Sequence, residues 1–161
     1  PLGSTDPRSG EPGRGNRSPR ENMSVLPIFG GKLSLRKGHV NNLYRDLESL
    51  YSYFCANRTQ LSTDFVAIVR MSLRLLTETA ASEMKKARID DYVADYFDQA
   101  KRSLDRNTKT YLSSHSVDKN TIIKLLHTGA HKYSSSNNEE QTLAISVVLG
   151  AMLSISHGKR P

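Results

Sequence analysis

An uncharged run near the C-terminus, residues 143–155, decides more about the possible folds than any other part of the sequence. It contains no ionisable side chain, and small residues recur in it among large aliphatic ones. A helix that is apolar nearly all round belongs in the middle of a helical bundle. The run falls well short of the roughly 20 residues that a membrane-spanning helix needs. We therefore expect a buried core helix and no membrane contact.

Apolar residues recur three and four positions apart over much of the remaining chain, which is the spacing of one helical face. We expect helices over 39–56, 63–86 and 89–104. Residues 107–115 offer one or two further turns. A fifth helix follows Asp118 and ends near Gly129, and a last one runs from Asn138 to about 156, started by a capping box between Asn138 and Gln141. No strand pattern is present. The sequence predicts an all-α fold, a single bundle of about five to six helices joined by short loops.

The expected second helix carries both apolar and charged positions. Its start, residues 62–64, offers side-chain oxygens that can cap the first turn. Ile68 is expected to point inward. Arg70, Arg74 and Glu78 are four apart and share one face. We interpret them as a surface ladder of ion pairs; the alternative is a charged stripe that meets a phosphate or the histidine segment.

The first 22 residues have a different composition from the rest. Residues 1–4 resemble the remnant of a cleaved fusion tag, and residues 5–22 are mostly Pro, Gly, Ser, Arg and Asn. Such a segment cannot bury enough apolar surface to offset the entropy lost on ordering. We expect a disordered tail over 1–22, an irregular lead-in over 23–38 that lies along the bundle, and a helical domain over 39–158.

The chain carries a formal net charge of +7, most of it outside the tail. This excess is compatible with a nucleic-acid partner and also with solubility alone. Cys55 is the only cysteine, which excludes an internal disulfide and a cysteine zinc cluster. We expect it to be buried and inert. With no signal peptide or membrane span, an intracellular location is expected, and no glycine loop or other motif predicts a cofactor.

Two histidines, His127 and His131, are four positions apart and share one helical face. Zinc-binding HExxH helices use this spacing, but the glutamate is missing here, and a third ligand would have to be Asp118, His115 or His157. His131 could instead transfer a proton, because an unperturbed histidine titrates near neutral pH. The plainer interpretation is a histidine bonded to a backbone carbonyl at a helix end.

Two segments, residues 69–78 and 125–131, together resemble HEPN-like helical domains, including relatives from abortive-infection and restriction systems. In that family a helix with an arginine and a glutamate precedes a helix that ends in a turn of small residues and histidine. The resemblance implies a helical bundle that often dimerises and, in active members, an RNase with an RxxxxH motif. No histidine follows an arginine at that spacing here. The departure favours a non-catalytic relative.

We therefore expect a non-catalytic, helical nucleic-acid-binding domain, for DNA or RNA, excised from a larger intracellular protein with a possible role in prokaryotic defence. One alternative is a module for protein interaction or homodimerisation. The other is a HEPN-type RNase that uses His127 or His131 with an arginine such as Arg74. Nucleic-acid contacts are assigned on charge alone to Arg36, Lys37, Lys85, Lys86, Arg88, Lys101, Arg102, Arg106, Lys109 and Lys132.

Overall fold

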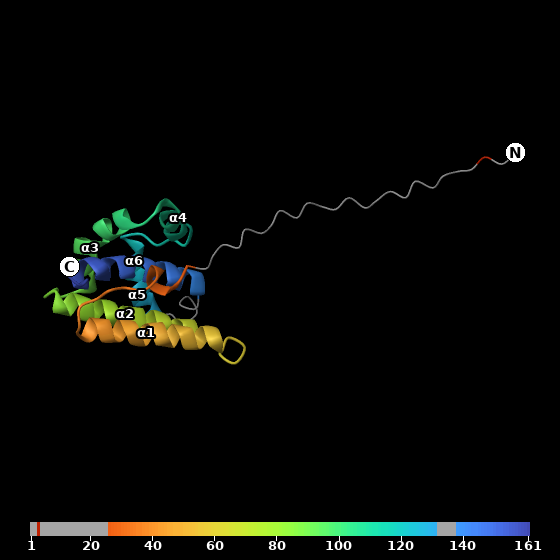
Figure 1. Cartoon of the computed structure of the whole chain (residues 1–161), viewed down its shortest axis with the longest axis horizontal. Coiled ribbons are helices and arrows are strands. Elements are labelled where there is room, and N and C mark those ends of the chain that lie inside the picture. The colour runs from red at the N-terminus through yellow and green to blue at the C-terminus, as the bar shows by residue number, and fades with distance from the viewer. Residues whose placement is uncertain (1–2, 4–25, 132–137) are drawn as a thin grey trace.

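The computed structural model describes Gly3 and residues 26–131 and 138–161, with side chains not described at 128–131. Within these residues the chain is all-helical, and six α-helices form a bundle (Figure 1), which confirms the predicted fold class. The expected tail lies outside the described residues except for Gly3. The elements are η1 (Ile28–Gly30), α1 (His39–Ala56), α2 (Phe65–Glu83), α3 (Ile89–Ser103), α4 (Arg106–Ser114), α5 (Thr121–His131) and α6 (Glu139–His157).

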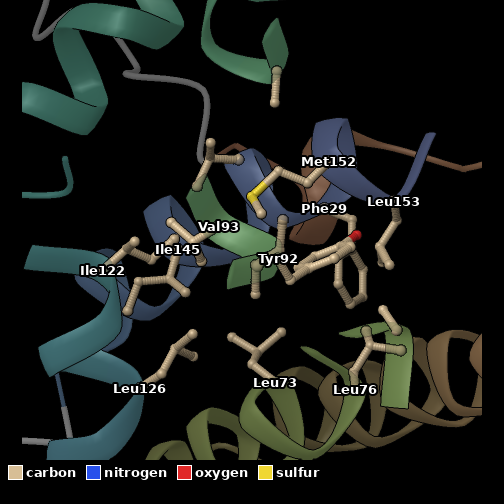
Figure 2. Packing of buried hydrophobic residues seen from close by; sticks show 14 of the residues in the cluster. Phe29, Leu73, Leu76, Tyr92, Val93, Ile122, Leu126, Ile145, Met152 and Leu153 are labelled. Carbon is tan, nitrogen blue, oxygen red and sulfur yellow. The ribbon is translucent and has the colours of Figure 1, made fainter. Parts of the chain in front are cut away.

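Helix α6 is the centre of the bundle. Every residue from 142 to 150 is buried, and α2, α3, α4 and η1 all pack against this helix. In Figure 2, Ile145 and Met152 of α6 lie beside Tyr92 of α3, with Leu73 of α2 and Ile122 of α5 closing the same core. The predicted core helix is thus confirmed. In the described part of the chain no helix combines the length and the apolar character needed to cross a membrane.

The lead-in before α1 packs into the core. Phe29 is buried, its amide donates to Ser146 Oγ of α6 at 3.0 Å, and its ring meets Tyr44 of α1 edge-on at 5.1 Å between centroids. Gly150 makes this approach possible, because a Cβ atom there would lie 2.5 Å from the Phe29 carbonyl oxygen. The expectation that this segment lies along the bundle is confirmed, and it contributes buried side chains of its own.

The lead-in then runs beside the C-terminus of the chain. Leu35 and Gly158 form an isolated antiparallel bridge, and the Lys159 amide donates to the Ser34 carbonyl at 2.9 Å. Consequently the start of α1, the end of α2 and the end of α6 gather at one end of the bundle, on the left in Figure 1. Five of the ten candidate cations lie at this end of the bundle.

The expected faces of α2 are wrong at two positions. Ile68 is half exposed, and Arg70, expected on a surface ladder, is only 1% exposed. The predicted inward residues Val69, Leu73, Leu76 and Ala80 are buried, and the buried face extends to Val66 and Ala67 together with Arg70. The ion pair between Arg74 Nε and Glu78 Oε1 does form at the surface, at 2.9 Å. Apolar spacing did not reveal that an arginine occupies the inner face.

Arg70 is buried because it has polar partners on α6. Its Nε donates to Thr142 Oγ1 at 3.1 Å, and its Nη2 donates to Gln141 Oε1 at 3.1 Å and the Asn138 carbonyl at 3.2 Å. Burial lowers the pKa of Arg70 to about 10. The guanidinium therefore remains charged at neutral pH and ties α2 to the start of α6.

Three local predictions are corrected. No side chain caps α2, because backbone carbonyls of residues 62–64 accept the first amides instead. Only half of the capping box forms: Asn138 Oδ1 accepts from the Gln141 amide at 3.0 Å, whereas the Gln141 side chain bonds Arg70 and the His115 carbonyl. Cys55 is exposed rather than buried, because the inner face of α1 passes through its neighbour Phe54.

Candidate nucleic-acid interface

The structure separates nine of the ten cations that the sequence singled out into two groups. Lys132 lies outside the described residues. Four cations lie near the junction of α3 and α4: Lys101, Arg102, Arg106 and Lys109. The other five lie where α1 begins and α2 gives way to α3: Arg36, Lys37, Lys85, Lys86 and Arg88.

The end of the bundle that holds the second group also receives the C-terminal cations. We call Arg36, Lys37, Lys85, Lys159 and Arg160 the basic end. None of them is paired with a carboxylate among the residues that the structure describes. Arg36 donates through Nη2 to the Ser156 carbonyl at 2.9 Å, a neutral acceptor that holds the guanidinium in place without cancelling its charge.

A hollow of about 380 Å³ opens on the basic end. Arg36 and Lys37 line one side of it, and Glu83, Met84 and His157 line the other. The lead-in supplies the first side and the ends of α2 and α6 supply the second, so the hollow depends on the pairing of the lead-in with the C-terminus. The hollow brings two cations close to one buried histidine.

That histidine belongs to a buried hydrogen-bond chain that sequence reasoning missed. Tyr92 Oη and Ser156 Oγ are 2.8 Å apart, Ser156 Oγ and His157 Nδ1 are 2.7 Å apart, and His157 Nε2 lies 3.0 Å from Glu83 Oε2. Burial lowers the pKa of His157, although the Glu83 carboxylate opposes this shift. Both ring nitrogens of His157 have partners, and the hydrogen-bond chain links α2, α3 and α6.

A larger cleft of about 790 Å³ lies between the end of α2, the start of α3 and α5. We call it the α2–α3 cleft. His127 of α5 lies at its edge, with Nε2 4.0 Å from Asp90 Oδ1, and Arg88 Nη2 donates to Asp90 Oδ2 at 2.8 Å. The Arg88 guanidinium is the main reason that the pKa of Asp90 is lowered. Lys86 also lines the cleft and pairs with Asp95 of α3.

The residues of the RNase alternative lie partly in this cleft. His127 lines it, and so does Glu78, the ion-pair partner of Arg74. His131 is the last residue of α5, and its side chain is not described. Among the described residues, no three side chains of the His, Cys, Asp and Glu types lie close enough together to hold a metal ion.

A different surface, apolar, lies on the outer side of α1 and α2. Ile68, Met71 and Leu75 follow one another along α2, and each is about half exposed. A shallow groove of about 220 Å³ beside them is lined by Leu43, Leu50 and their neighbours. The sequence analysis missed this stripe because it assigned Ile68 to the core.

The comparisons with known proteins add no family to this description. The chain matches no protein-family model, no curated protein and no solved structure. The resemblance to HEPN-like domains therefore stays a prediction from residues 69–78 and 125–131.

Proposed function

We propose that the basic end binds the phosphate backbone of a nucleic acid, without catalysis. The observation that carries this proposal is the convergence of three separate segments, residues 36–37, 85 and 159–160, into one end of the bundle with no carboxylate partner in the described part of the chain. Backbone binding needs several cations on one face, since each phosphate contact contributes separately and releases counterions.

Two of the four cations near the α3–α4 junction have a simpler explanation. Lys101 and Arg102 lie in the last turn of α3, where positive charge is favoured by the negative end of the helix dipole. They also help to lower the pKa of Asp98, although Lys119 has the larger effect on this pKa. Lys101 and Arg102 therefore have a role in supporting α3, and the α3–α4 junction provides a control surface for the binding experiment.

The test is a salt titration of binding to labelled duplex and single-stranded oligonucleotides. Lys37→Glu combined with Lys85→Glu should weaken binding and reduce the slope of log affinity against log salt by about 2, because each lost phosphate contact removes roughly one unit. The matched control is Arg102→Glu combined with Arg106→Glu, both exposed and away from the basic end. No binding at low salt, a flat salt response, or equal losses in the two double variants would contradict the proposal.

Self-association is the second candidate function, and the exposed stripe of Ile68, Met71 and Leu75 favours it. A two-fold contact uses the same patch on both copies, and a stripe along one helix can pack against its own copy. Sedimentation equilibrium should then show a dimer that Met71→Glu converts to a monomer, whereas Ala94→Glu on the exposed side of α3 should not. A monomer for the unmodified chain at high concentration would rule the candidate out.

A further inference from the structure

We infer that the α2–α3 cleft holds one unstacked base of a single-stranded nucleic acid while the basic end holds the neighbouring phosphates. This inference rests on the proposed function and deepens it, since it names single strands as the preferred partner. The cleft, at about 790 Å³, falls within the range of roughly 300–1,000 Å³ typical of pockets for small organic groups.

The charge of the cleft suits a neutral base better than a phosphate. Its lining contains two cations, Lys86 and Arg88, and two carboxylates, Glu78 and Asp90. These charges balance, and each cation is already paired with a carboxylate. A phosphate would meet the two acidic groups, whereas a base could donate its amino hydrogens to them.

The surfaces that a base needs are present in the same cleft. Ala81, Ile89 and Ile123 provide an apolar lining from three helices. His127, partly exposed at the edge, offers an aromatic ring, and bases removed from the stack pack against aromatic side chains of this kind. The lining therefore combines an apolar wall, a stacking ring and acceptors for hydrogen bonds.

The cleft and the basic end are neighbours along the same turn of the chain. Ala81 and Ser82 line the cleft, whereas Glu83 and Met84 line the hollow beside Arg36. Lys85 comes next in the sequence, after the residues that line the hollow and before Lys86, which lines the cleft. One strand that places a base in the cleft would thus bring its adjoining phosphates to the basic end.

The experiment compares a labelled single-stranded dodecamer with a duplex of the same length, using the full chain and a variant that fills the cleft. Ala87→Trp adds a large side chain at an exposed position of the cleft lining, and Ala94→Trp adds the same side chain at an exposed position of α3 outside it. We expect Ala87→Trp to weaken single-strand binding about tenfold, the loss of one base contact, and to leave duplex binding unchanged. Ala94→Trp should behave as the unmodified chain does.

A second pair of variants tests the stacking ring. His127→Phe should keep most of the single-strand affinity, and His127→Ala should lose it. A mononucleotide should compete only weakly, because it lacks the phosphates that the basic end holds.

Equal affinity for strand and duplex together with no effect of Ala87→Trp would overturn the inference while leaving backbone binding intact. Competition by the mononucleotide as strong as by the strand would also overturn it, and absence of binding to both oligonucleotides would overturn the proposed function itself.

Discussion

Replacing Gly150 with alanine in the middle of α6 should destabilise the protein, although helix propensity alone predicts the opposite. Alanine is favoured over glycine inside a helix by about 1 kcal/mol. The added methyl group, however, would lie 2.5 Å from the Phe29 carbonyl oxygen and 3.1 Å from Phe29 Cβ. The first contact is with the backbone, so a change of side-chain rotamer cannot relieve it.

The size of the effect follows from what must move. Overpacking a filled core costs about 1–3 kcal/mol. Lifting Phe29 away from α6 also lengthens its bond to Ser146 Oγ, which contributes about 1 kcal/mol more. After the gain in propensity is subtracted, we expect a net loss of about 2 kcal/mol and a decrease in Tm of about 4–8 °C for a chain of this length.

Urea denaturation followed by circular dichroism measures this free energy of unfolding. Ser154→Ala, an exposed substitution in the same helix, is the control and should change the stability by less than about 0.5 kcal/mol. A Gly150→Ala protein as stable as the unmodified chain, or more stable, would refute the close packing of η1 on α6.

Three further predictions follow from the buried polar groups and the cleft. Arg70→Met should lower the free energy of unfolding by about 3 kcal/mol, because it leaves the polar partners on α6 unsatisfied. The control, Arg74→Met, should change the free energy of unfolding by less than about 1 kcal/mol. Urea denaturation of both variants measures the two changes. The contribution of His157 should be fully present above the ordinary histidine pKa of 6.5 and should decrease as the pH falls through its lowered folded pKa. A pH series of unfolding curves should therefore show a free energy of unfolding that decreases as the pH falls below about 6.5. The His157→Gln substitution should make this decrease smaller. Labelled RNA incubated with the protein should stay intact, and RNA loss that His127→Ala abolishes would instead establish the nuclease alternative.

The arrangement of helices along the chain was largely predictable because it depends on local spacing. The predicted limits of α1 are those observed, and the uncharged run is the core helix, since an apolar surface on all sides has no other stable place in a bundle. Residues 107–115, expected to form one or two turns, coincide within one residue at each end with α4. The predicted end of α5 near Gly129 is two residues early, which is the usual uncertainty at helix ends.

The candidate site was predictable only as a list of cations. Spacing along the sequence does not say that Arg36 lies beside the end of α6, because their proximity depends on the bridge between Leu35 and Gly158. Nor does it say that Arg70 is buried, because its partners come from a helix far along the chain. Apolar periodicity assigned Ile68 to the core for the same reason: the inner face of a helix is decided by its neighbours.

The central place of α6 has a consequence for how the protein is made. In the described part of the chain the other five α-helices precede α6, and the Phe29 amide bonds a side chain 117 residues downstream. During synthesis these five helices leave the ribosome before α6, so the apolar surfaces that pack against α6 stay uncovered until it emerges. Chaperones that bind exposed apolar segments should bind the growing chain throughout this interval. A chain whose translation stops before residue 139 should be degraded by proteases.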